Sequence, residues 1–598
     1  MTPAPALSCA PAHPMPIHLH ARRAAALRVV AALAVAAVAA VALPAAAATP
    51  VPADRIWFGG PIVTVDDARP KAEAVAVRDG RIVHVGSKAA AMRLRGASTE
   101  LVDLKGRTLL PGFIDGHGHM SGVGLMAVAA NLLPPPDGSN ATIDAVLESL
   151  RTWMKTSPLP TRYGLILGWG YDDSQLKEGR HPTRDDLDRV STDVPVYLMH
   201  ISGHIGVVNS KGLEALGLDA ATPDPEGGRI RRRDGSREPD GVLEETANFG
   251  AAMQLIFAKA GKAESEGMLL AGQQAYLSYG YTTAQEGAAD RSQVDGYIAA
   301  AQAGKLLVDV VAYPSFVTAD PKWFSGEWSG RRYRGGFRIG GLKITLDGSP
   351  QGRTAWLTQP YHQAPAGEKP GYAGYPAFPD AFVQKTIRQA FENGWQVLAH
   401  TNGDAALDQF LKAVELARTT VPGDRDRRPV AIHAQTARAD QVDRMKALGV
   451  VPSFFPMHTY YWGDWHRDVT LGPVRAPDIS PTGWALRRGL KFTSHHDAPV
   501  VFPNSMRVLA STVNRTTRSG KVLGPQQRVD PIVAIKAMTL WAAYQHFEES
   551  TKGSIQVGKI ADFAILDGNP LTVPRATLVD LKVTETVKAG RTVWTRGR

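Results

Sequence analysis

The chain has 598 residues, which is enough for one large domain together with a smaller one. Apolar residues make up 44% and charged residues 21%, an ordinary globular balance, and the formal net charge is +10. The charge includes a run of arginines at residues 229–233, but neither interleaved aromatic residues nor a nucleic-acid-binding motif accompanies it. We therefore interpret the run as a solvated loop and predict no nucleic-acid partner.

Residues 1–48 have the features of a secretory signal peptide. The basic pair Arg22-Arg23 precedes the alanine-rich stretch 24–43, and small residues at 45–48 would suit a signal peptidase. About 20 apolar residues can also span a bilayer, but the weak hydrophobicity of alanine and the small-residue exit favour cleavage. We predict an exported protein, periplasmic or secreted, with no stable membrane anchor after cleavage.

The only cysteine, Cys9, lies within this segment, so the mature chain is expected to contain none. This excludes disulfide bonds, although an exported protein could have formed them, and it excludes thiolate metal ligands. Any bound metal ion must therefore be held by histidine, carboxylate or a less usual group.

Both ends of the mature chain read as short strands. Residues 55–110 contain several apolar runs, two of them separated by the turn dipeptide Asp79-Gly80, and residues 561–594 have the same character. Neither end is large enough to fold alone. We predict one small β-sandwich built from residues 49–110 and 555–598.

Residues 111–554 alternate strand-like apolar runs with helical patterns, which predicts an α/β domain with a parallel sheet. The number of strands and the length predict a (β/α)₈ TIM barrel with insertions, the largest at about residues 160–260. The candidate strands are residues 164–168, 196–199, 281–284, 307–312, 342–346, 396–399, 430–432, 450–453 and 491–494. The candidate helices are residues 263–280, 379–393, 404–419 and 439–448.

Polar residues follow four of the apolar runs, at the strand ends where a parallel barrel places its catalytic groups. His117 and His119 follow the first run, and residues i and i+2 of a strand point to the same side. His400 and His433 end two later runs, and His495-His496-Asp497 follow another. In a chain without cysteine, this pattern predicts a divalent metal site.

Lys343 is the unusual member because it lies inside an apolar run, at Leu342-Lys343-Ile344. A buried lysine is costly unless it is paired or chemically changed. An outward-facing lysine is the alternative, and periodicity does not distinguish the two.

The order His-x-His, Lys, His, His, Asp resembles that of the amidohydrolase superfamily of metal-dependent hydrolases, and residues 559–566 resemble its C-terminal return strand. The resemblance covers about residues 55–590. Further motifs resemble the branch that contains N-substituted formamide deformylases and exoenzyme regulatory proteins. They lie at residues 202–204, 209–210, 241–245, 347–354 and 432–435.

The resemblance implies that Lys343 is carboxylated on its amine and bridges two ions, with zinc as the favoured metal. One ion would be held by His117, His119, the Lys343 carbamate and Asp497. The other would be held by the carbamate, His400 and His433. Thr401-Asn402 and His495-His496 depart from the common pattern, so a mononuclear site stays open.

The predicted reaction is hydrolysis of an amide or formamide-like, non-peptide C–N bond in a small molecule by a metal-activated hydroxide. Asp497 would act as base and then as acid, and one metal ion, assisted by His204 or His458, would polarise the carbonyl. Five further residues lie on loops after candidate strands, where they could contact the substrate or pack within the loops. They are Trp169, Tyr171, Arg353, Tyr460 and Trp462.

Two alternatives remain at this point. The same scaffold could hydrolyse a lactone, an ester or a cyclic imide. The chain could also be a non-enzymatic regulatory or binding protein, although an intact ligand set argues against this. The sequence leaves open whether the chain forms a homo-oligomer.

Overall fold

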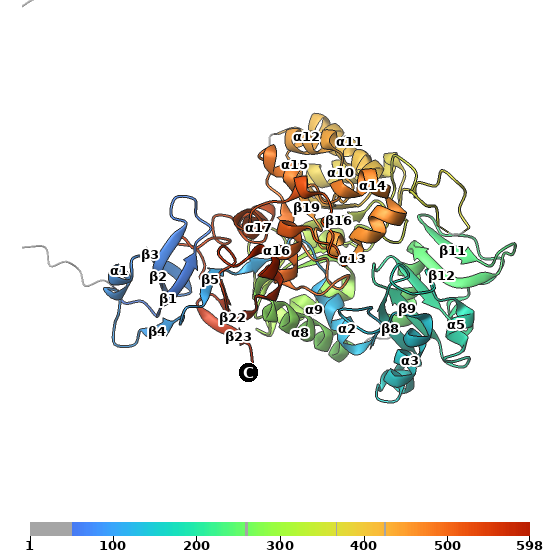
Figure 1. Ribbon diagram of the computed structural model, residues 1–598, viewed down its shortest axis with the longest axis horizontal. Coiled ribbons are helices and arrows are strands. Elements are labelled where there is room, and N and C mark those ends of the chain that lie inside the picture. The colour runs from blue at the N-terminus through green and yellow to red at the C-terminus, as the bar shows by residue number, and fades with distance from the viewer. Residues whose placement is uncertain (1–50, 258–260, 366, 424–425, 598) are drawn as a thin grey trace, which may run out of the picture. The chain divides into compact units, whose positions relative to one another are not determined.

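The computed structural model describes residues 51–257, 261–365, 367–423 and 426–597 (Figure 1). The predicted signal peptide lies outside the described residues and stays a prediction. Residues from Pro52 onward form one compact unit. Within the described ranges, no helix is both long enough and apolar enough to cross a lipid bilayer.

Strands from both ends of the chain form one eight-stranded sheet, in the order β23-β22-β21-β5-β1-β2-β3 with β4 paired to β1 (Figure 1). Strand β21 joins the two ends because it pairs antiparallel with β5, Phe563 lying opposite Pro111. The bounds are β1 Arg55–Val63, β2 Lys71–Arg78, β3 Arg81–Gly86, β4 Glu100–Asp103, β5 Thr108–Pro111, β21 Phe563–Leu566, β22 Val583–Lys588 and β23 Arg591–Thr595. The pairing establishes a shared sheet, whereas the sandwich stays a prediction.

Parallel strands form the centre of the fold, in the sheets β6-β13-β14-β15 and β16-β17-β18-β19-β20. Only Gly340 separates β15 from β16, so the two sheets continue each other through one interrupted strand. The bounds are β6 Phe113–Ile114, β13 Tyr281–Ala289, β14 Asp309–Pro314, β15 Phe337–Ile339, β16 Gly341–Thr345, β17 Gln396–Thr401, β18 Val430–His433, β19 Val451–Phe454 and β20 Thr493–Ser494.

The two outer strands of this series lie near each other. A Cβ atom on Gly116, just beyond β6, would lie 2.7 Å from Oγ1 of Thr493 on β20. Backbone pairing between β20 and β6 is not among the strand pairs of the described residues, so the closed barrel stays a prediction. The α/β architecture with parallel strands is as expected from the sequence.

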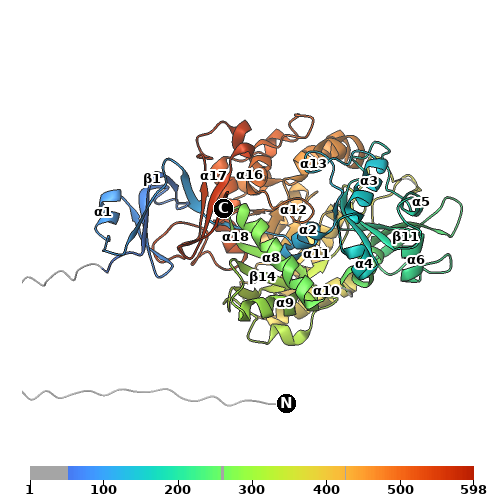
Figure 2. The ribbon, with the colours of Figure 1, turned by 90° about the horizontal axis from the view of Figure 1, so that it is seen from below.

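Helices follow these strands as the alternating pattern predicts. Two of them, α2 and α8, are in backbone contact (Figure 2). A Cβ atom on Gly124 would lie 1.9 Å from the carbonyl oxygen of Met268, and one on Gly272 would lie 2.1 Å from that of Met120. Because α2 begins directly after His119, this contact fixes the segment that carries the His-x-His pair.

The helices of the parallel-strand region, with shorter turns, have these bounds: α2 Met120–Val128, α8 Lys262–Ser278, α9 Arg291–Gln302, α10 Asp380–Asn393, α11 Asp404–Thr420, α12 Ala439–Leu448, α13 His458–Trp465, α14 Gly472–Arg475, α15 Thr482–Arg487, α16 Ser505–Asn514, α17 Pro531–Ala537 and α18 Leu540–Gln545. Helix α1 (Lys88–Met92) belongs to the terminal sheet. π-Helical turns lie at Met253–Phe257 and His466–Thr470, and 3₁₀ turns at Pro321–Phe324, Ala476–Asp478, Pro525–Gln527 and Arg575–Asp580.

A separate six-stranded sheet, β11-β12-β10-β9-β8-β7, is inserted between α2 and α8. The apolar runs 164–168 and 196–199, which we expected among the strands of the parallel domain, belong to this inserted sheet instead. The insertion begins about 30 residues earlier than predicted. Its strands are β7 Ala130–Asn131, β8 Ile166–Tyr171, β9 Val196–His200, β10 Ile205–Val208, β11 Gly228–Arg232 and β12 Pro239–Glu245. Its helices are α3 Ile143–Met154, α4 Leu159–Tyr163, α5 Arg184–Asp188, α6 Ser210–Leu216 and α7 Thr246–Ala252.

The arginine run expected to be a solvated loop forms strand β11 of this sheet. Arg231 pairs with the buried carboxylate of Glu244, and Arg229 pairs with Glu368. The charge of these two arginines is therefore partly neutralised within the chain.

Candidate metal centre

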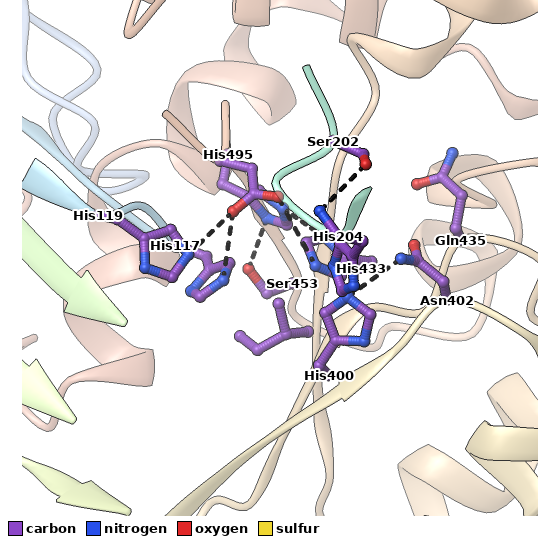
Figure 3. Close-up of polar contacts among 12 residues, drawn as sticks. His117, His119, Ser202, His204, His400, Asn402, His433, Gln435, Ser453 and His495 are labelled. Atoms are coloured by element: carbon purple, nitrogen blue, oxygen red, sulfur yellow. Dashed lines mark hydrogen bonds and ion pairs between the residues drawn. The ribbon is translucent and has the colours of Figure 1, made fainter. Parts of the chain in front are cut away.

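The structure brings the six predicted ligands together at the carboxyl ends of the parallel strands, and Figure 3 shows the four histidines among them. The amine of Lys343, inside β16, lies 3.0 Å from Nε2 of His117. Asp497 Oδ1 lies 3.4 Å from Nε2 of His117 and 3.5 Å from Nε2 of His119. Asp497 Oδ2 lies 3.8 Å from Nε2 of His433, whose ring centre is 4.6 Å from that of His400.

Solvent reaches this cluster from one side. The side chains of His119 and Asp497 are 27% and 12% exposed, whereas those of His117 and His433 are almost fully buried. Lys343 is also buried, so the outward-facing alternative does not apply.

Three of the predicted ligand histidines are each oriented by a hydrogen bond at Nδ1. Nδ1 of His117 lies 2.6 Å from Oε1 of Gln285, and Nδ1 of His400 lies 3.1 Å from Oδ1 of Asp347. Nδ1 of His433 lies 3.1 Å from Nε2 of His495. Such partners fix the ring of a metal-binding histidine and leave Nε2 for the ion.

Two residues of the cluster have left-handed backbone conformations, which few residues other than glycine adopt. The φ angles are 54° at Asp497 and 69° at His433. Backbone strain of this kind costs about 1–3 kcal/mol per residue and concentrates at functional sites. The surrounding packing therefore holds both side chains where an unstrained chain would not place them.

Burial sets the charge state of the cluster. It lowers the pKa of Lys343 to about 7, although the carboxylate of Asp497 opposes the change. Burial, together with nearby cationic groups, also lowers the pKa values of His117, His400 and His433 well below that of a free histidine. Neutral imidazoles carry the nitrogen lone pair that a metal ion requires.

The donor set fits a divalent metal ion. Ligand atoms of His117, His433 and Asp497 all lie within 4.8 Å of one another. Ligands bound tetrahedrally at 2.0–2.2 Å would be separated by about 3.3–3.6 Å, close to the distances around Asp497. Oδ1 of Asp497 is buried without a hydrogen-bond partner, as expected of an atom whose partner is an ion.

His204 lies beside this cluster, with its ring centre 4.8 Å from that of His400 (Figure 3). Its Nδ1 lies 2.6 Å from Oε2 of Glu245, whose φ is 50°. Burial lowers the pKa of His204, but the charge and hydrogen bond of Glu245 outweigh burial and raise it. The pair presents a positively polarised imidazole next to His400.

The other predicted catalytic histidine, His458, is not in contact with the predicted ligands. Its Nδ1 lies 3.0 Å from Nε2 of His466. The ring of Phe455 packs against both His458 and His433, at 4.7 and 6.1 Å between ring centres.

The predicted substrate-binding aromatics are mostly packed into the protein. Trp169 and Tyr171 are buried within the insertion, and Trp462 is buried with its Nε1 donating to Asp172 at 2.8 Å. Tyr460 is partly buried beneath the guanidinium of Arg507, 4.2 Å from its ring centre. Their contact with a substrate stays a prediction.

Arg353, the remaining predicted substrate contact, is a charged residue, and its guanidinium has no carboxylate partner within 4 Å among the described residues. The guanidinium lies 5.5 Å from the ring centre of Trp465, and its buried Nε has no hydrogen-bond partner. Burial lowers the pKa of Arg353.

Sequence reasoning did not assign functions to Gln285, Asp347, Glu245 and His495. Asp347 and Glu245 lie in motifs that carried the family resemblance, and His495 precedes Asp497, so their positions offered a signal. Gln285 lay just beyond a predicted strand end and offered none.

The chain is similar to known proteins over most of its length. The family model described as "Amidohydrolase family" matches residues 100–594. The putative amidohydrolase YtcJ of Bacillus subtilis is 28% identical over 90% of this chain and 99% of its own length. The N-substituted formamide deformylase of Arthrobacter pascens is 28% identical over 88% of this chain and 96% of its own length.

A solved structure supports the fold. An uncharacterized metal-dependent hydrolase from Pyrococcus horikoshii OT3 superimposes with a TM-score of 0.69 at 24% identity. The match covers 87% of this chain and 99% of the other.

Proposed function

The chain belongs to the amidohydrolase family, and from this membership we propose that it is a metal-dependent hydrolase of a non-peptide C–N bond. The substrate class is a small amide or formamide, which the similarity to an N-substituted formamide deformylase supports. The observation that carries the proposal is the convergence of three imidazole Nε2 atoms on the carboxylate of Asp497.

The residues that would hold metal are His117, His119, Lys343, His400, His433 and Asp497, with one or two ions and zinc favoured. When bound, such an ion lowers the pKa of water towards about 7 and polarises a carbonyl group. Five of these six donors are buried, and the sixth, His119, is partly exposed to solvent.

Carboxylation of Lys343 is part of the proposal for a two-ion site. A neutral amine adds to CO₂, forming an N–C bond and releasing one proton. The lowered pKa of Lys343 supplies the neutral amine near pH 7. The product is a carbamate anion that offers two oxygens in place of the buried amine.

Asp497 would move the proton. Its carboxylate takes a proton from the attacking water and later gives it to the leaving nitrogen, a task worth about 10²–10⁴-fold in rate. Its place between His117, His119 and His433 supports this role.

His204 would stabilise the oxygen of the carbonyl as negative charge develops on it. Glu245 holds Nδ1 of His204, which leaves Nε2 free to donate. We assign this role to His204 rather than to His458 because only His204 contacts one of the predicted ligands.

Arg353 is the predicted substrate contact best suited to bind an anion, because none of the carboxylates that the structure describes lies within 4 Å of its guanidinium. We propose that it binds a carboxylate or another acidic group of the substrate. Export and oligomeric state stay predictions.

The test is a panel of N-formyl and N-acyl amines, lactams, lactones and esters, assayed with the zinc-loaded protein. Asp497→Asn should lower kcat by about 10²–10⁴-fold while circular dichroism shows an unchanged fold. Asp530→Asn, at an exposed helix N-cap, is the matched control and should keep full activity.

Chelation should remove the activity, and adding the metal back should restore it. Full activity of Asp497→Asn, or turnover that a chelator does not affect, would contradict the mechanism. Hydrolysis of esters or lactones without any amide would assign the protein to the alternative reaction.

A further inference from the structure

A second cluster of metal-competent side chains lies in the inserted sheet, outside the centre described above. Asp173 follows β8, His181 lies in the next loop, and His200 ends β9. All three are buried, and their ligand atoms lie within 4.8 Å of one another. The proposed mechanism uses none of them.

The geometry of this cluster suits one ion between two imidazoles and one carboxylate. Nε2 of His200 lies 3.1 Å from Oδ1 of Asp173, and Nε2 of His181 lies 3.6 Å from Oδ2 of Asp173. Tetrahedral ligands at 2.0–2.2 Å would be about 3.3–3.6 Å apart. Both oxygens of one carboxylate thus face a histidine, and each histidine presents Nε2.

A hydroxyl group lies beside Nδ1 of each ring. Nδ1 of His181 is 3.0 Å from Oη of Tyr171, and Nδ1 of His200 is 2.8 Å from Oγ of Ser202 and accepts the backbone N–H of Ser202 at 3.2 Å. At His181 the hydroxyl can accept from Nδ1–H, the arrangement that frees Nε2 for an ion. At His200 the ring proton lies on Nε2, which faces Asp173, so binding of an ion would move that proton to Nδ1, where Oγ of Ser202 can accept it.

One contact within this cluster is longer than a hydrogen bond. The 3.6 Å between His181 and Asp173 is beyond hydrogen-bond distance, so the carboxylate binds only one ring directly. Asp172 adds a second buried carboxylate, with Oδ1 4.0 Å from Nε2 of His200. A divalent cation would offset the cost of burying two adjacent acids.

We propose that Asp173, His181 and His200 bind a divalent transition-metal ion of the zinc type, separate from the catalytic centre. Nitrogen and carboxylate donors are those that zinc and related ions prefer. The site is closed by burial, so the ion has a structural role, and water or Asp172 completes its coordination.

The position of this ion suggests what it stabilises. His200 is followed by the turn that carries His204, and Oγ of Ser202 accepts the backbone N–H of His204 at 3.1 Å. Because Oγ of Ser202 also contacts Nδ1 of His200, an ion held by His200 would fix the turn that presents His204 to the catalytic cluster.

The direct test is a crystal of the wild-type protein grown with zinc and measured on both sides of the zinc absorption edge. An anomalous peak between Asp173, His181 and His200 supports the proposal, and its absence overturns it. This measurement does not require a variant to fold. It also does not require activity, so it is independent of the proposed function.

Metal analysis of the full chain after loading with zinc gives a second measurement. His181→Gln and His200→Gln should each hold one zinc ion fewer per chain than His466→Gln. His466 is a suitable control because it is also buried and hydrogen-bonded, to His458 and Thr470, without a carboxylate. Equal zinc content in all three folded variants would contradict the proposal.

Discussion

The hydrogen bond between Gln285 and His117 gives the sharpest test of how the candidate metal centre is organised. Oε1 of Gln285 lies 2.6 Å from Nδ1 of His117, and both side chains are buried. Losing a partner of this kind typically weakens metal binding by about 10–100-fold. At about 1.36 kcal/mol per tenfold, Gln285→Leu should reduce the free energy of zinc binding by about 1.4–2.7 kcal/mol.

A second glutamine offers a matched control. Nε2 of Gln285 and Nε2 of Gln545 both donate to the carbonyl of Gly116, at 3.1 and 2.7 Å, but only Gln285 also contacts His117. Gln285→Leu and Gln545→Leu should therefore lose comparable stability, since each removes a buried donor from the same oxygen. Only Gln285→Leu should lose affinity for zinc.

The assay is an equilibrium competition for zinc between the metal-free protein and a chromogenic chelator, at pH 7. Thermal melting of the two variants checks that they remain folded and are destabilised to a similar degree. Equal zinc affinities in Gln285→Leu and Gln545→Leu would refute the view that Gln285 orients His117 for the ion.

Three further changes test other parts of the structure. Glu245→Gln should lower the pKa of His204, because the negative charge that raises this pKa is lost. The alkaline limb of the pH profile of kcat/KM should therefore move to lower pH. A limb that does not move would contradict the role of His204. Folding lowers the pKa of Glu548, so its ionised carboxylate stabilises the fold at pH values above the unfolded-state pKa of about 4.3, and this stabilisation is lost as pH falls through the lower folded-state pKa. The difference in Tm between the wild type and Glu548→Gln should therefore become smaller in acid. A difference that does not change with pH would refute the linkage. Gly124→Ala should lower the free energy of unfolding, measured in urea, by about 1–3 kcal/mol, because α2 and α8 touch at this residue. The control Gly267→Ala, on an exposed part of α8, should not destabilise the protein. Similar effects of the two substitutions would argue against the contact.

The ligand histidines and Asp497 could be predicted because each follows an apolar run that becomes a buried parallel strand. In such a fold, the position of a residue after its strand already determines the face on which its side chain lies. Lys343 was detectable for a different reason, since a lysine within an apolar strand needs an explanation. The β21 return strand was likewise visible as a short apolar run closed by a turn.

The assignment of β8 and β9 to another sheet was not available from their residues. Strands buried on both faces have the same apolar character in either sheet, and only their partners distinguish them. The two residues of β7, Ala130–Asn131, are too few to give a periodic signal.

The surroundings of individual side chains could also not be predicted from the sequence. Trp462 follows a predicted strand, as a pocket residue would, yet it lies on α13 with its indole bonded to buried Asp172. Gln285 acts on His117 across a sequence separation of 168 residues. Neither relationship has a local sequence pattern.

The pairing of β21 with β5 has a consequence for how the protein is made. The ribosome releases β5 early, but the strand that covers its open edge is among the last to emerge. A chain that stops before β21 would display β5, with its unpaired amides and carbonyls, to other chains. The terminal sheet can therefore be completed only when the whole chain has been synthesised. A truncated product would be prone to aggregation or degradation.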